Sequence, residues 1–451
     1  MEFEKILSLP AKFVDIRVCE HISRRIIIED GKTKEISLGK IYGIGIRVLD
    51  KIWGFASSNN ASKAYEIAEK ALKIAKSGEK DIELGKTDLY KKKIEIKPKI
   101  NPLDVELDEI KEILTEIEKE IKGKKVSSTS LSYGDSIIKT SYLSSEGSKI
   151  ETKTFRTFAS VTVFARENGY LQVASERLGG VGGIELIKKI REKAIEAKER
   201  AVRLLSAKSP PIGKFRVILD PKLTGVFIHE ALGHAVEADH VLQKESILED
   251  MLNKRVASPL VTIYDDPTIP KSFGFYFYDD EGVKAEKKTI IENGILKEFL
   301  HSRETAGALK SIPKGNARAQ SYDFIPIPRM SNTYLAPKNF SFEELIEDIN
   351  FGVYLKGSKG GEVDTARGVF QFSAEEGYII ERGEIKQQIR DVALSGSTLE
   401  ILRNIDGVAD DFEIHIGFCG KAGQYVPVGD GGPHIRTIAT VGGINGYRKS
   451  S

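Results

Sequence analysis

The stretch Asp220–His240, DPKLTGVFIHEALGHAVEADH, is where we expect the functional residues of this 451-residue chain. Two of the chain's seven histidines, His229 and His234, fall within six residues, and Glu230 directly follows the first. Histidine is a common metal ligand, and paired imidazoles beside a carboxylate are typical of a metal site. We therefore predict that this stretch binds a divalent cation.

The same stretch has the features of a buried helix. Asp220 can cap its start, and Pro221 suits the first helical position. Because unsatisfied polar groups are costly to bury, a histidine–glutamate pair in such a helix needs partners, and a cation would satisfy both histidines. The apolar residues that indicate burial are Leu223, Val226, Phe227, Ile228, Ala231, Leu232 and Val236.

The spacing of the two histidines requires a local distortion. His229 and His234 are five positions apart, which on an α-helix is a rotation of roughly 140° and too far round to hold one ion. A single π-type turn, bonded from i to i+5, would bring both rings to one side. We predict such a turn, with Gly233 as its place because no side chain obstructs it. The alternative is two unrelated histidines that share a helix with a glutamate.

Composition limits the classes of function. With 68 basic and 66 acidic residues the formal charge is +2, so nothing indicates a nucleic-acid partner. No run of 18 apolar residues and no basic head before an apolar segment is present, so we expect no membrane span, no signal peptide and a cytoplasmic protein. Two cysteines, Cys19 and Cys419, make a disulfide framework improbable, and one could be a metal ligand.

The chain is long enough for two domains, and Ser209-Pro210-Pro211 marks the predicted boundary. We predict an α+β protein, with a mixed α/β domain at 1–209 and a strand-rich, largely antiparallel domain at 210–451 that carries the metal-site helix. In the first domain we expect strands at 13–18, 25–29 and 41–48, helices at 60–77, 107–122 and 184–205, and a meander over 126–170 with turns at 134–135, 146–147 and 168–169.

Two further segments allow two interpretations each. The glycine run 178–183 could hold phosphate before a helix, but it lacks the P-loop lysine, so a flexible connector is favoured. Asp279-Asp280-Glu281 could bind a cation, but before Gly282 a turn is favoured. Segments 368–373 and 377–381 are predicted to form a hairpin. The other elements predicted after residue 210 are strands at 215–219, 259–264, 273–279, 288–292 and 295–300, and a helix at 342–349.

A catalytic zinc site usually has three protein ligands and one open position. Segment 411–420 alternates like a strand, with His415 and Cys419 on one face. They would lie about 13 Å apart, so only one of them could reach a given ion. The candidates for the third ligand are Glu237, Asp239, His240, Glu245, Glu249, His415, Cys419 and His434.

Five ordered motifs resemble the TldD/PmbA family of metallopeptidases, and specifically its TldD-like subunit with an HExxxH motif. The resemblance spans essentially the whole chain, and HExxxH and CGKxGQ are its most specific parts. The motifs are HEALGH (229–234), YDDEG (278–282), ENGILKEFLHSR (292–303), PRMSNTY (328–334) and CGKAGQYVPVGDGGPHIR (419–436).

The resemblance implies a zinc site made by His229, His234 and Cys419, with Glu230 as catalytic acid and base. It also implies hydrolysis of short or unfolded peptides and a dimer, either with a PmbA-like (TldE-like) subunit or with a second copy. We expect substrate along an edge strand, with 367–373 and 328–334 as candidate walls. The alternative function is a non-catalytic interaction or regulatory protein with structural zinc or none; a fourth protein ligand, such as Glu237 or His240, would favour it.

Overall fold

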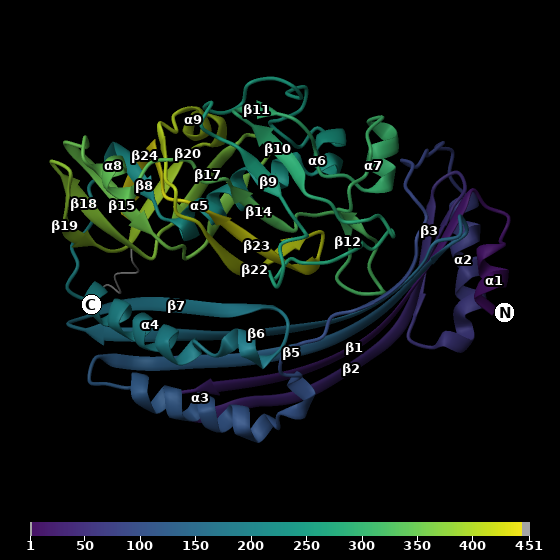
Figure 1. Ribbon diagram of the computed structural model, residues 1–451, viewed down its shortest axis with the longest axis horizontal. Coiled ribbons are helices and arrows are strands. Elements are labelled where there is room, and N and C mark those ends of the chain that lie inside the picture. The colour runs from purple at the N-terminus through teal and green to yellow at the C-terminus, as the bar shows by residue number, and fades with distance from the viewer. Residues whose placement is uncertain (1, 444–451) are drawn as a thin grey trace.

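The N-terminal part of the chain is built around one long, curved sheet of seven strands (Figure 1). The computed structural model describes residues 2–443. The strand order is β3-β2-β1-β5-β6-β4, β7 pairs with another part of β6, and β4 alone runs parallel to its neighbour. The strands are β1 (Phe13–Glu29), β2 (Lys32–Leu49), β3 (Trp53–Ser58), β4 (Lys91–Glu95), β5 (Val126–Ser144), β6 (Lys149–Glu167) and β7 (Tyr170–Val181).

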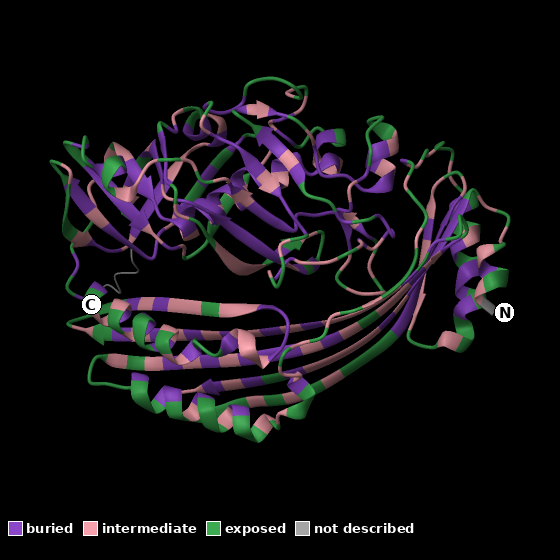
Figure 2. Ribbon diagram, viewed as in Figure 1, coloured by how far each residue is buried: buried purple, intermediate pink, exposed green. Residues whose placement is uncertain are grey.

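The three predicted helices of this part are present and pack on the sheet. Two of them, α3 and α4, bury their inner faces in a shared core with the strands, whereas α1 and α2 pack at the opposite end (Figure 2). Their apolar residues recur every three or four positions, which creates one buried side on each helix. The helices are α1 (Glu2–Leu7), α2 (Ala64–Lys76), α3 (Leu107–Ile121) and α4 (Ile190–Leu204).

One predicted turn of the meander is wrong. The turns at 146–147 and 168–169 are confirmed, but β5 continues straight through Gly134-Asp135. A Cβ on Gly134 would lie 2.4 Å from the ring of Phe158 on β6, so the glycine makes room for an aromatic side chain. Asp135 is buried because Arg24 on β1 binds its carboxylate at 2.8 Å.

The glycine run is not a loop. Residues 178–181 belong to β7, and the last two glycines lead into a short 3-10 turn at Ile184–Ile187. A Cβ on Gly180 would lie 2.1 Å from the carbonyl oxygen of Lys271, and one on Gly183 would lie 1.8 Å from that of Ile100. These glycines therefore permit close backbone packing, and the connector interpretation is wrong for most of the run.

Two sheets enclose the C-terminal core. A nine-stranded sheet has the order β16-β17-β20-β24-β8-β15-β18-β19, with β21 beside β24, and a six-stranded sheet has the order β11-β10-β9-β14-β23-β22. Helix α5 (Pro221–Phe227) contacts strands of both sheets and so lies between them. Most pairs are antiparallel, and 43% strand exceeds 22% helix, which confirms the predicted α+β class.

The bounds of the C-terminal elements are as follows. The strands are β8 (Gly213–Leu219), β9 (Ile263–Asp265), β10 (Lys288–Glu292), β11 (Ile295–Leu296), β12 (Ala317–Arg318), β13 (Ile327–Pro328), β14 (Asn332–Leu335), β15 (Phe351–Lys356), β16 (Gly361–Asp364), β17 (Val369–Ser373), β18 (Glu376–Glu381), β19 (Glu384–Ile389), β20 (Val392–Ser397), β21 (Gly407–Val408), β22 (Glu413–Lys421), β23 (Gln424–Gly432) and β24 (Ile435–Gly443). The remaining helices are α6 (Ala238–Leu242), α7 (Arg303–Ala308), α8 (Phe342–Ile346) and α9 (Thr398–Arg403).

The C-terminal predictions are confirmed for β8, β10 and α8 and wrong in other places. Residues 273–279 form no strand, and of 295–300 only the first two residues do. The predicted hairpin is absent, since β17 pairs with β16 and β20 whereas β18 pairs with β15 and β19. Alternating residues identified both strands correctly, but alternation carries no information about which strand lies beside which.

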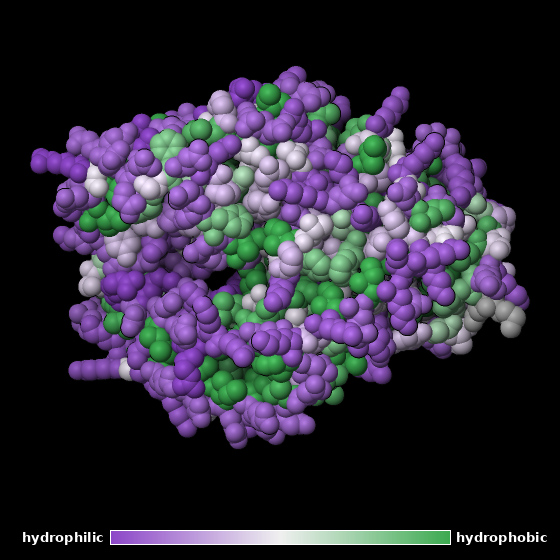
Figure 3. All heavy atoms as spheres, in the orientation of Figure 1, coloured by the Kyte–Doolittle hydropathy of each residue, from purple (hydrophilic) through white to green (hydrophobic). Residues whose placement is uncertain are grey.

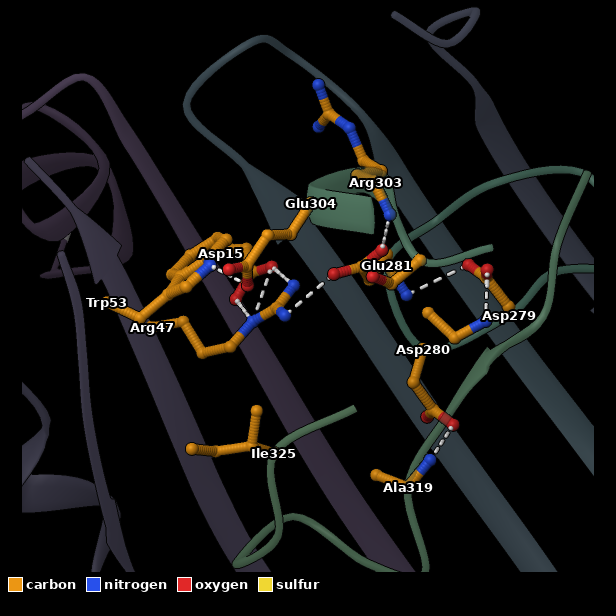
Figure 4. A network of polar contacts seen from close by, with 12 residues as sticks. Asp15, Arg47, Trp53, Asp279, Asp280, Glu281, Arg303, Glu304, Ala319 and Ile325 are labelled. Carbon is orange, nitrogen blue, oxygen red and sulfur yellow. Dashed lines mark hydrogen bonds and ion pairs between the residues drawn. The ribbon is translucent and has the colours of Figure 1, made fainter. Parts of the chain in front are cut away.

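A buried charge network joins the two parts of the molecule (Figure 4). Arg47 on β2 binds Asp15 on β1 and, at 2.8 Å, Glu281 from the C-terminal part. Glu281 also accepts the backbone N–H of Arg303 at 2.6 Å. Asp279 accepts the backbone N–H groups of residues 281 and 283, so the favoured turn is confirmed and its carboxylates are used in structural contacts.

Apolar side chains also gather in the hollow between the two parts (Figure 3). Phe158 of β6 contacts Phe273 and Phe418, which come from the C-terminal part. The seven-stranded sheet uses strands up to residue 181, and the other sheets use strands from 213 onward. The division at residue 209 stays a prediction. Between residues 2 and 443, the longest helices are too short or too polar to cross a membrane.

Candidate metal centre

The helix that carries the two histidines changes its winding where the spacing requires it. Asp220 caps α5 by accepting the N–H of Leu223 at 2.8 Å, and Pro221 occupies the first turn. Residues Ile228–Gly233 then form a π-helical turn, followed by a 3-10 turn at His234–Val236. The predicted π-turn is confirmed. It absorbs the extra residue between the histidines.

Gly233 has a packing reason that the sequence does not reveal. Its backbone is right-handed helical, with φ −58° and ψ −44°, so any residue could adopt that conformation. A Cβ there, however, would lie 2.0 Å from the sulfur of Met330, which is fully buried. The glycine therefore lets Met330 pack directly beneath the π-turn.

Three potential ligands come together beside the π-turn. His229, His234 and Cys419 each offer one ligand atom, and these atoms lie within 4.8 Å of one another. The Sγ of Cys419 is 3.5 Å from Nε2 of His234, and the two imidazole rings are nearly perpendicular with centroids 5.5 Å apart. Cys419 arrives on β22 and is 3% exposed. The group is thus nearly closed to solvent.

The charges of this group favour the ligand form of the cysteine. Burial alone would raise the pKa of Cys419, but His229 and His234 outweigh it and lower that pKa to about 5. Burial would likewise lower the pKa of His229, and the Cys419 sulfur raises it to about 9. At neutral pH the sulfur is therefore a thiolate, which is the form that binds metals.

Glu230 lies beside the three potential ligands but outside their group. Its side chain is 40% exposed, and its Oε2 is 3.7 Å from Nε2 of His234. A carboxylate with this exposure can exchange protons with solvent and still reach a molecule bound near the histidines.

The other candidates for the third ligand have different partners. Glu237 accepts a hydrogen bond from Nδ1 of His234 at 2.9 Å, whereas Lys421 contacts both Glu237, at 3.0 Å, and Asp239, at 2.7 Å. His240 lies 3.5 Å from Glu245. Glu249 belongs to neither potential metal group of residues 2–443.

His415 and His434 line a separate polar cavity of about 250 Å³ at the start of α5. His434 receives the hydroxyl of Tyr354 on Nε2 at 2.8 Å and binds Asp411 through Nδ1 at 2.6 Å. His415 lies 3.3 Å from Glu413. The structure therefore brings only Cys419, among the distant candidates, to the two histidines.

Sequence reasoning missed Lys421. Its position two residues after Cys419 was a usable clue, because side chains two positions apart in a strand project to the same face. The carboxylates that Lys421 contacts come from residues 237 and 239, and only the folded chain shows that β22 passes beside them.

Comparisons with known proteins cover most of the chain. Three family models match in order: PmbA/TldA metallopeptidase domain 1 at residues 14–75, the central domain at 100–205 and the C-terminal domain at 212–443. A metalloprotease of Methanocaldococcus jannaschii is 49% identical over 98% of this chain and 99% of its own length. A zinc metalloprotease TldD homolog of Saccharolobus solfataricus is 35% identical over 96% and 97%.

Solved structures show the same fold at low sequence identity. A candidate modulator of a DNA gyrase from Thermotoga maritima has a TM-score of 0.80 at 23% identity, covering 98% of this chain and 99% of its own. TldE from Thermococcus kodakarensis has a TM-score of 0.76 at 20% identity and covers 98% of each chain.

Proposed function

The chain belongs to the PmbA/TldD metallopeptidase family, and we propose that it is a zinc-dependent peptidase that hydrolyses bonds in short or unfolded peptides. The observation that carries the proposal is the convergence of His229, His234 and Cys419 beside the half-exposed carboxylate of Glu230. The names of the relatives, metalloprotease and zinc metalloprotease, support the same class.

The donor set fits zinc. Two imidazoles and a thiolate are common zinc ligands, and bond lengths of about 2.0 and 2.3 Å in a tetrahedron imply a nitrogen–sulfur separation of about 3.5 Å. The observed separation between Cys419 and His234 is 3.5 Å. In addition, Nδ1 of His229 is buried without a hydrogen-bond partner within the described chain. The group has three members, which is the number of protein ligands typical of a catalytic zinc site.

Bound zinc would polarise the scissile carbonyl and make water a better nucleophile at neutral pH. His229, His234 and Cys419 would hold the ion. Glu230 would take a proton from the attacking water and then give it to the nitrogen of the leaving amine. One carboxylate could serve both steps, because its side chain is 40% exposed and lies 3.7 Å from His234.

An extended peptide would bind along a free strand edge near the π-turn, since main-chain pairing tolerates many sequences. Segment 367–373 stays a candidate wall, and β17 within it lies between β16 and β20 and so offers no free edge. Segment 328–334 also stays a candidate wall, and it is almost entirely buried in this structure. Among the described strands β16 ends the nine-stranded sheet, and it packs near the π-turn, so we propose β16 as the pairing edge.

The test is peptide hydrolysis by the wild type and by Glu230→Gln, with zinc content measured in both. We expect the variant to keep its zinc and to lose about 10²–10⁴-fold in kcat, the range typical of a general acid–base group. Unchanged hydrolysis by Glu230→Gln would remove Glu230 from the mechanism.

The alternative function, a non-catalytic interaction or regulatory protein, would be favoured by a closed zinc site. Glu237, the leading candidate for a fourth ligand, is instead engaged with His234 and Lys421. We propose a cytoplasmic dimer, formed with a TldE-like subunit or a second copy, and the structural similarity to TldE supports the first arrangement. A mass measurement of the purified complex would distinguish the two.

A further inference from the structure

A ring of polar contacts surrounds one side of the candidate metal group. Oε2 of Glu237 accepts from Nδ1 of His234 at 2.9 Å and lies 3.0 Å from Nζ of Lys421. Lys421 follows Cys419 by two positions in β22, so both project to the same face. The 3.5 Å contact between Cys419 Sγ and His234 Nε2 closes the ring.

The ammonium group of Lys421 is held by three acceptors. They are Oδ1 of Asp239 at 2.7 Å, Oε2 of Glu237 at 3.0 Å and the carbonyl oxygen of Pro328 at 3.1 Å. Three acceptors match the three N–H donors of a lysine. Glu237, Asp239 and His240 could otherwise be taken for a second cation site, but the ammonium already lies between the two carboxylates.

We propose that Glu237 and Lys421 are positioning residues for His234, an inference that rests on the proposed zinc-dependent function. A carboxylate can only accept, so its contact with Nδ1 requires a proton on that atom and leaves Nε2 as the ring nitrogen that could bind a metal. Nε2 is the atom that faces the Cys419 sulfur. Partners of this kind fix the tautomer and ring orientation of metal-binding histidines.

Lys421 has a distinct part in the same arrangement. Glu237 is fully buried, and a buried carboxylate requires a charged or hydrogen-bonded partner to stay in place. Lys421 provides it, with a side chain that is only 9% exposed. Strand β22 therefore carries one ligand, Cys419, and also the anchor for the group that orients another ligand, His234.

The experiment measures zinc affinity by competition with a chelator and the absorption spectrum of the cobalt(II)-substituted protein. The proteins are the wild type, Glu237→Gln, Lys421→Met, the double variant and Lys222→Met. Lys222→Met is the matched control, since Lys222 contacts the buried Glu375 at 2.7 Å outside the ring. Thermal unfolding of each metal-free protein shows that it is folded, and Glu237→Asp, which keeps the charge but shortens the reach, is the second variant.

We expect Glu237→Gln to weaken zinc binding by about 10–100-fold, because an amide can present its NH₂ to Nδ1 and select the wrong tautomer. Lys421→Met should weaken it less, and the double variant should bind no worse than Glu237→Gln, because the two residues act as one unit. Both single variants should change the cobalt spectrum, and the control should not.

Three outcomes would overturn the inference while leaving the proposed function standing. They are wild-type zinc affinity and cobalt spectra in the folded single variants, additive losses in the double variant, and tighter zinc binding by Lys421→Met, which would mean that the ammonium only repels the ion. A wild-type protein that binds no zinc would refute the proposed function itself, so the two failures are distinguishable.

Discussion

Two buried polar clusters in this molecule join segments far apart in sequence, and they differ in how their groups are satisfied. In the network of Figure 4, each carboxylate of Asp15 and Glu281 meets the guanidinium of Arg47 or a backbone N–H. In the candidate metal centre, ligand atoms of three residues face one another and Nδ1 of His229 has no partner within the described chain. The first cluster holds two parts of the molecule together, whereas the second gathers three potential ligand atoms in one place and is suited to bind an ion.

The largest expected effect tests the metal centre. Cys419→Ser removes a proposed ligand, so we expect it to weaken zinc binding by more than about 100-fold, the upper range for the loss of an outer partner. Cys19→Ser is the matched control, since Cys19 is also buried but lies on β1. Chelator competition measures both affinities. Equal zinc affinity in the two variants would remove Cys419 from the ligand set.

The next effect tests the first cluster. Arg47→Met leaves the buried carboxylates of Asp15 and Glu281 without their cation, and we expect a loss of about 3–5 kcal/mol in the free energy of unfolding. Zinc content should be unchanged. Lys70→Met, which breaks an exposed pair with Glu66, should change stability by under about 1 kcal/mol. Denaturant unfolding of the zinc-free proteins measures the difference, and lost zinc binding in folded Arg47→Met would contradict the distinction drawn between the clusters.

A smaller effect is expected at the π-turn. Gly233→Ala places a methyl group against the buried sulfur of Met330 and should cost about 1–3 kcal/mol of stability. It should also weaken zinc binding, because the strain separates His234 from His229. Gly442→Ala is the control, since a Cβ there meets nothing within 4 Å. Calorimetric unfolding compares them, and equal stability of both variants would refute the packing role of Gly233.

The smallest effect concerns pH. In the zinc-free protein the Cys419 thiolate should absorb in the ultraviolet at pH 7 and disappear as the pH falls through about 5. Because the folded pKa is below the ordinary value of 9.0, the stability that the thiolate contributes is complete above 9.0 and is lost by about pH 5. Burial raises the pKa of Cys19 to about 11, so Cys19 gives no signal at pH 7. Survival of the pH 7 absorbance in Cys419→Ser would contradict the assignment.

The sequence predicts features that depend on nearby residues better than contacts between segments far apart in the chain. The π-turn follows from the spacing of His229 and His234, and the amphipathic helices follow from their periodicity. The turn predicted at Gly134 fails because that glycine accommodates Phe158 from a neighbouring strand. The role of Lys421 depends in the same way on a partner more than 180 positions away. Such partners are decided by tertiary packing and leave no local pattern.

The origin of Cys419, 185 positions after His234, has a consequence for biosynthesis. A chain still attached to the ribosome, or truncated before β22, contains both histidines and Glu230 but lacks the sulfur. If Cys419 holds zinc as proposed, hydrolysis therefore requires synthesis and folding of the chain at least through β22.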